Sequence, residues 1–250
     1  FDRNGISFTM DPSIKNSTFS VKASNNDVGN VLGIGSGLTS YLDTNKTLGD
    51  LKLDGWDWNN LSNAVKGTGA ITEQKDDDGN VIGYVDENGN RVNKDGYLVD
   101  EDNNLLFEVK INDTVIGRYS KDTEMNTVIN AINANTEAGV RVEYSKTSGQ
   151  FVFTAKDTGS AGRVDIEAGG LGAAIFGATL DADGNRLGSL GDDYSDGKDA
   201  LLNVTINGQD MDLVRSSNTV DLDGMSVTLN GTFTATNDEE KVSFTSKTDS

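Results

Sequence analysis

Apolar and polar residues alternate along most of this chain in short runs. A period of two places successive side chains on opposite faces of a strand, so the pattern predicts β-strands. The runs are bounded by Gly, Asn or Asp, which favour turns, and Gly occurs 29 times against a single Pro. Because the runs lie close together, we expect antiparallel sheets. The expected strands span residues 18–23, 105–111, 140–144, 150–155, 202–206, 225–229 and 241–245.

One segment instead has the period of a helix. We expect this helix to begin after Asp122 or Thr123, either of which can accept a hydrogen bond from a free N–H group of the first turn. Gly139 is expected to end it. Its apolar face carries Met125, Val128, Ile129 and Ile132.

The hairpin expected after this helix has a counterpart near the start of the sequence. Residues 139–142 and 151–155 form its two strands, with a Ser-Gly turn between them. Residues 5–8, a polar loop and residues 19–23 repeat the same order of a glycine-led strand and a phenylalanine-led strand. We interpret this as two modules, with the sequence beginning partway through the first.

An acidic segment rich in Gly and Asn, residues 75–104, separates the modules. It contains Asp-Gly-Asn or Asn-Gly-Asn loops at 76–80 and 86–90, and a third occurs at 181–185. Such loops offer the oxygen ligands that calcium prefers. An EF-hand loop, however, has its Gly at position six and a bidentate Glu at position twelve, whereas here Gly is fourth. We therefore predict plain hairpin turns rather than a calcium site.

Composition narrows the function further. The 40 acidic and 21 basic residues give a net charge of −19, which argues against nucleic acid and against an anionic membrane surface as partners. No His or Cys is present, which removes Ser-His-Asp and Cys-His catalysis, imidazole or thiolate metal sites and disulfides. The Gly-rich run at 33–37 lacks the flanking elements of a nucleotide loop, so we interpret it as a connector. We expect no enzyme, no catalytic, cofactor-binding or metal-binding residue, and no cofactor.

Aromatic residues suggest one competing function. Trp56 and Trp58 are two residues apart, so in a strand both rings would face one side, as a sugar-stacking platform requires. Tyr84 and Tyr97 would extend it. We prefer a contribution of the Trp rings to the core, while a secreted carbohydrate-binding or adhesive module with a host surface glycan as its partner stays open.

The strand, helix and hairpin unit resembles the flagellin hook IN motif. Its most characteristic part is the helix that carries Ile132-Asn133, and residues 42–51 resemble the leader that often precedes such a module. The matching segments are 106–112, 122–123, 128–133, 138–140 and 151–157. A second match resembles the start of the carboxy-terminal region of the flagellar filament cap protein family, also called the hook-associated protein 2 family. Its segments are 197–200, 206–209, 215–219 and 224–229.

Together these observations predict a mainly β fold with a short helix, of the α+β class. We expect small antiparallel-sheet domains, either in tandem or with one inserted in the other. Residues 1–45 would be a partial first IN-like module, 46–190 a second one with the acidic hairpin insert, and 191–250 the start of the carboxy-terminal region of the cap protein. A domain shared by 1–45 and 191–250 is the open alternative.

The resemblance implies a structural component of the bacterial flagellum that acts outside the cell in motility. Family members are exported unfolded and form a cap at the filament tip, under which flagellin inserts. The implied partners are flagellin and further copies of the protein. Helical, coiled-coil-forming legs that grip the filament would lie outside this sequence. A variable domain of flagellin or of a hook–filament junction protein is the other assignment that stays open.

Overall fold

The computed structural model describes residues 18–22, 24, 38–39, 41–51, 53–187, 195–206, 208–222 and 224–231. These residues confirm the predicted class: they form small antiparallel sheets and two α-helices. The chain divides into two compact units, which are Phe1–Asp157 with Gly162–Asp196, and Thr158–Ala161 with Gly197–Ser250. No helix in the described ranges has both the length and the apolar character needed to cross a membrane.

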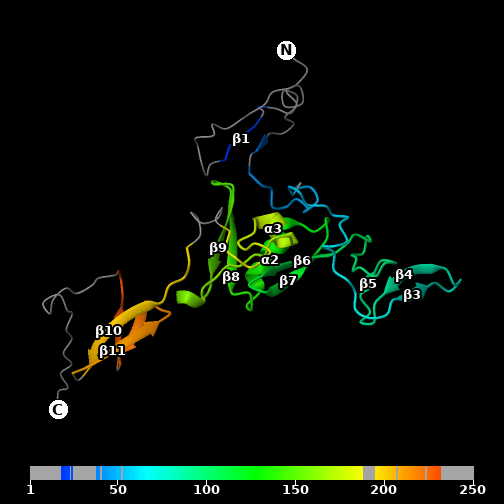
Figure 1. The fold of residues 1–250 in the computed structure, drawn as a ribbon. Coiled ribbons are helices and arrows are strands. Elements are labelled where there is room, and N and C mark those ends of the chain that lie inside the picture. The colour runs from blue at the N-terminus through cyan, green and yellow to red at the C-terminus, as the bar shows by residue number, and fades with distance from the viewer. Residues whose placement is uncertain are drawn as a thin grey trace. The chain divides into compact units, whose positions relative to one another are not determined.

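The core of the first unit lies where α2 (Met125–Ala134) and α3 (Leu171–Phe176) pack on two hairpins (Figure 1). One hairpin pairs β6 (Phe107–Ile111) with β7 (Thr114–Tyr119), and the other pairs β8 (Val140–Ser145) with β9 (Gln150–Ala155). Alternate residues of β6 and β8 are buried, as a strand with one face on the core requires. The fully buried side chains here include Leu48, Phe107, Val109, Ile111, Met125, Val128, Ile132, Val140 and Val142.

Helix α2 confirms the predicted apolar face but corrects both predicted ends. Met125, Val128 and Ile132 are buried, while Ile129 is half-buried. The N-cap residue is Glu124, and no side chain caps the helix. The helix ends at Ala134, well before Gly139, whose φ of +62° instead marks the turn into β8.

The turn between β6 and β7 explains a strand that the pattern missed. Asn112 and Asp113 both have positive φ, 52° and 62°, as a two-residue type I′ hairpin turn requires. Strand β7 follows at once, but its Val115 and Gly117 break the alternation of apolar residues. The predicted Ser-Gly turn between β8 and β9 is confirmed, with Gly149 at a φ of +72° and its N–H bonded to the Ser145 carbonyl.

The acidic insert forms the expected small hairpins. Strands β3 (Thr72–Lys75), β4 (Val81–Val85) and β5 (Arg91–Val92) make a three-stranded antiparallel sheet. A further pair joins β1 (Ser20–Val21) to β2 (Leu38–Thr39).

The second unit contains two more hairpins and a short 3₁₀ helix. Strand β10 (Ala200–Ile206) pairs with β11 (Gln209–Arg215), and β12 (Thr219–Leu222) pairs with β13 (Met225–Thr228). The 3₁₀ helix, Gly159–Ala161, is held by Ser160, which donates from its N–H and its hydroxyl to the Asp199 carboxylate.

Three predicted features cannot be compared with the structure. The strands predicted at 5–8 and 241–245 and the connector predicted at 33–37 lie outside the described residues.

Candidate functional site

Five loops in the described residues share one hydrogen-bonding pattern, in which an Asp or Asn opens the loop. In the loop at 76–80, Oδ1 of Asp76 accepts from the N–H groups of Asp78, at 3.1 Å, and of Asn80, at 2.8 Å. Its Oδ2 accepts from the Asn80 side chain at 3.1 Å. The Gly79 N–H bonds to the Asp76 carbonyl, and Gly79 has a φ of +84°. This is a three-residue hairpin loop whose left-handed position selects glycine.

The contacts from backbone N–H groups recur at four other places. The loops at 86–90 and 181–185 repeat them with Asp86 and Asp181 as the acceptors. Sequence reasoning missed the loops at 93–97 and 100–104, because Asn93 opens the first and Asn103, with a φ of 64°, takes the glycine position of the second. A search for Asp or Asn followed three residues later by Gly or Asn would have found both.

These contacts lower the pKa of the loop carboxylates. The Asn80 side chain is the largest cause at Asp76, and the Asn185 N–H is the largest at Asp181. At Asp100, burial raises the pKa, but hydrogen bonds, chiefly from the Ser120 and Asn104 side chains, outweigh it and the pKa is lowered. In each case the donors stabilise the ionised form.

Asp86 differs from the exposed loop acids because it is only 4% exposed. Its Oδ2 accepts from the Thr68 N–H at 3.0 Å, and its other contacts come from the N–H groups of Asn88 and Asn90 and from the Asn90 side chain. The Thr68 N–H is the largest cause that lowers the pKa of Asp86 to about 2. The Asp86 carboxylate therefore links the segment at 67–69 to the 86–90 loop by a hydrogen bond.

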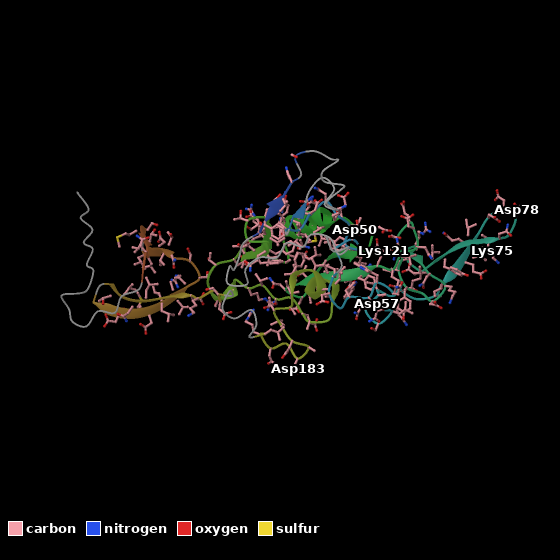
Figure 2. All side chains as sticks on the ribbon, turned by 90° about the horizontal axis from the view of Figure 1, so that it is seen from above. Asp50, Asp57, Lys75, Asp78, Lys121 and Asp183 are labelled. Atoms are coloured by element: carbon pink, nitrogen blue, oxygen red, sulfur yellow. The ribbon has the colours of Figure 1, made fainter. Side chains whose placement is uncertain are left out.

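The hairpin-turn interpretation of the Asp-Gly-Asn loops is thus confirmed. The oxygens of the carboxylates that open the loops accept hydrogen bonds from N–H donors. Other acids, such as Asp78 and Asp183, project from their loops (Figure 2). Among the described residues no group of three or more acids is placed to hold a metal ion. That the loops bind no calcium stays a prediction.

The two Trp rings occupy a turn rather than the strand assumed for a sugar platform, so that assumption was wrong. Their ring centroids lie 5.9 Å apart with an angle of 78° between the planes, and both rings meet Phe107 edge to face. Trp56 and Trp58 are half-buried against the core, which confirms the preferred interpretation. Rings at this angle offer a flat ligand no shared face.

The two tyrosines proposed to extend the platform lie in the acidic insert. Tyr84 belongs to β4, and Tyr97 is the last residue of the 93–97 loop. The Tyr97 ring already has a cation, because Lys66 Nζ lies 5.3 Å from its centroid.

Two shallow depressions occur on the first unit. One, of about 270 Å³, places Arg91 and Arg118 beside Asp100 and Glu101. The other, of about 350 Å³, runs beside β6 between residues 63–65 and 167–173 and contains Glu108, Lys110 and Glu167. Both mix acidic and basic groups, so neither offers a strong field of one sign to a charged ligand.

The residues of the IN-like motif and of its leader form the framework of the helix–hairpin module. The leader lies against the start of α2, where Met125 N–H donates to the Lys46 carbonyl at 3.0 Å and Asn126 N–H to the Thr44 carbonyl at 2.9 Å. Leu48 is fully buried. Carbonyl groups of a distant segment thus satisfy the free N–H groups of the first helical turn, which is why no side chain caps it.

Asn133 joins the end of α2 to β8. Its side-chain amide donates to the Val142 carbonyl at 3.0 Å, and its Oδ1 accepts from the Val142 N–H at 2.8 Å. The amide therefore imitates the backbone of a neighbouring strand at Val142. The adjacent Ile132 is fully buried. Ile132 therefore holds the helix against the core, and Asn133 sets which face of the helix is turned toward β8.

No known protein family, curated protein or solved structure gives a match to this chain. Its function must therefore be argued from its residues and their geometry.

Proposed function

We propose that this chain is the head portion of a flagellar filament cap protein, a structural and non-enzymatic component at the extracellular tip of the bacterial flagellum. There it would assemble with further copies of the protein and promote the polymerisation of flagellin. The support comes from two segments of sequence that resemble this family and from the contacts that one of them makes.

The observation that carries the proposal is the paired contact of Asn133 with Val142. Ile132-Asn133 was singled out as the most characteristic part of the IN-like motif. In the fold these two residues have separate, defined tasks: Ile132 fills the core, and Asn133 holds β8. The leader residues also contact the helix they precede, since Asn45 Oδ1 accepts from the Asn126 side chain at 2.8 Å. The motif residues therefore act together as one folded unit.

The chemistry of the described residues suits such a role. Their distinctive polar side chains, the loop aspartates, Asn112 and Asn133, are engaged in backbone hydrogen bonds that hold turns and strand edges. A stiff module of this kind can serve as a passive part of an assembly. In this proposal, helical legs outside the sequence grip the filament and the present chain forms the plate above them.

Deletion of the gene for the full-length protein, followed by restoration, tests the proposal. Without the protein, cells should release flagellin without building filaments, and electron microscopy should show hooks with no filament. Full-length protein should restore growth. A full-length Asn133→Ala variant should restore it less well at raised temperature, whereas Asn130→Ala, which changes an exposed helix residue, should match the parent. Normal filaments in the deletion strain would reject a cap function.

A further inference from the structure

The two outer edges of the β8–β9 hairpin differ, because β8 has a hydrogen-bonding neighbour at Val142 among the described residues. Val142 turns its N–H and C=O away from β9, because both bond to the Asn133 side chain. Val142 lies opposite Phe153, so these two residues form a pair without hydrogen bonds between them. Phe153 must then turn its own N–H and C=O away from β8.

Alternation along the strand extends this conclusion. If the backbone N–H and C=O of Phe153 point away from β8, those of Phe151 and Ala155 do so as well. The backbone groups of Gln150, Val152 and Thr154 then bond to β8. The Lys156 N–H fits this alternation, because it points toward β8 and bonds to the Gly139 carbonyl at 2.8 Å. Two backbone groups on each of three residues therefore line the outer edge of β9. Within the described ranges, no hydrogen bond to these groups is present.

This edge is rigid. The rings of Phe151 and Phe153 stack edge to face on Phe176 of α3, at 4.9 and 5.1 Å between centroids. Because the core holds β9 in place, a strand that adds to it meets a formed edge and bears little ordering cost on this side.

The edge also lacks the usual protection against pairing. Exposed edge strands are commonly guarded by charged residues, Pro or bulges. Residues 150–155 contain no charge and no Pro, their pairing with β8 is regular, and Val152 is 52% exposed. In a chain with a net charge of −19, this is a stretch where electrostatic repulsion between copies is weak, all the more because Lys146 and Lys156 flank it.

We propose that the outer edge of β9 pairs with β9 of a second copy of this chain, antiparallel and about a twofold axis at Phe153. This pairing sets Phe151 opposite Ala155 of the other copy and Phe153 opposite its equivalent. All the outward N–H and C=O groups of both strands then find partners. Lys156 lies opposite Gln150, so no like charges face each other. The partner is a second copy because the strand is complementary to itself in both hydrogen bonding and charge.

The first repeat offers a parallel. Its Phe-led strand contains β1, which pairs antiparallel with Leu38–Thr39, a segment outside the repeated stretches. A strand of this pattern can therefore take an antiparallel neighbour. At β9 the same chain supplies none in the described part, and a second copy takes that place. This inference does not depend on a flagellar function.

Disulfide trapping tests the register directly, since the chain has no Cys. Val152 would face Thr154 of the second copy in a pair without hydrogen bonds, where Cα atoms are about 4.5 Å apart and within disulfide range. A mixture of Val152→Cys and Thr154→Cys chains should crosslink at least about tenfold faster than Val152→Cys alone, whose cysteines would lie about 7 Å or more apart. Glu143→Cys mixed with Thr154→Cys is the matched control, with an exposed cysteine on β8 instead.

Amide hydrogen exchange of the unmodified chain provides a second readout. The Phe151, Phe153 and Ala155 amides should exchange more slowly as protein concentration rises, while the Val142 amide, which bonds to Asn133 Oδ1, should not change. Equal crosslinking in all mixtures, or exchange at Phe153 that is independent of concentration, would overturn the proposal. Protection by a synthetic 150–155 peptide but not by more of the chain itself would also overturn it, and would assign the edge to a foreign strand.

Discussion

Asn133 illustrates how one side chain can define this module. Its amide makes both hydrogen bonds that a neighbouring strand would make to Val142, from the end of a helix. Asn112 plays a related part, because its amide donates to the Ala138 and Arg163 carbonyls and its Oδ1 accepts from the Asp165 N–H. Polar side chains thus complete the hydrogen bonding of a fold made from short strands.

Removal of the Asn133 amide should be costly. Asn133→Ala leaves the N–H and C=O of the buried Val142 without partners, and we expect a loss of about 1 to 3 kcal/mol in the free energy of unfolding. Urea denaturation measures the loss. Asn130→Ala, on the exposed face of the same helix, is the control and should be close to neutral. Equal effects at the two positions would contradict the role given to Asn133.

The buried carboxylate of Asp86 should make stability depend on acid pH. Its pKa is about 2 in the fold against an ordinary 3.8, so the fold favours the ionised form. Its contribution is complete above 3.8 and is lost as pH falls through about 2. Asp86→Asn should lower the melting temperature at neutral pH and flatten its decline between those two pH values. Asp78→Asn, at an exposed loop position, should change neither the melting temperature at neutral pH nor its decline in acid. If the melting temperatures of the parent and of Asp86→Asn fall in parallel as the pH is lowered, this account is refuted.

At the scale of elements, the leader and helix α2 depend on close backbone contact. Gly49 N–H donates to the Lys121 carbonyl at 2.7 Å, and a Cβ at Gly49 would lie 3.1 Å from that oxygen and 3.2 Å from Lys121 Cβ. A side chain at this position would therefore be in a tighter contact than most, and Lys121 or the leader would have to shift by a few tenths of an ångström. Figure 2 shows the neighbouring Asp50 and Lys121 beside each other on this part of the molecule.

Gly49→Ala should consequently destabilise the protein by about 1 to 3 kcal/mol, because the new methyl group overpacks the contact between the leader and Lys121. Gly170→Ala is the matched control: a Cβ there meets nothing within 4 Å, and its φ is −88°. Because Gly170 is the N-cap of α3, where Gly is preferred to Ala, that change should cost about 0.5 kcal/mol, less than the loss expected for Gly49→Ala. Thermal melts of both variants decide the matter, and a Gly49→Ala chain as stable as the parent would show that the contact is not tight.

Patterns within a short stretch of sequence predicted the hairpins and the buried helix face correctly. They could not predict contacts between distant stretches. The hairpin of β8 and β9 and the buried face of α2 follow from local periodicity. The start of α2 was placed wrongly because carbonyl groups near Lys46, far away in sequence, satisfy its first N–H groups. Strand β7 and helix α3 were missed because Gly117 interrupts the first and the second has only six residues. The sequence analysis recognised loop turns by their glycines. It therefore missed the 100–104 loop, in which Asn103 takes the place of the glycine.

For the whole molecule, the net charge of −19 suggests affinity for cations, but the loop geometry opposes a specific site. The oxygens of Asp76, Asp86 and Asp181 already accept hydrogen bonds, and calcium takes six to eight oxygen ligands. Calorimetry with calcium should show no saturable site tighter than about 100 µM. A tighter site that disappears in an Asp76→Ala, Asp78→Ala double variant would contradict the turn interpretation.

Localisation on the cell tests the proposed function most directly. The β3–β4 hairpin tip at 76–80 is exposed, so antibodies raised against it should reach the assembled protein. Immunogold electron microscopy should then place label at the distal tip of each flagellar filament, with no label in a strain that lacks the gene. Label along the whole filament would assign the chain to flagellin, and label between hook and filament would assign it to a junction protein. Label on the cell surface away from flagella would contradict a flagellar role altogether.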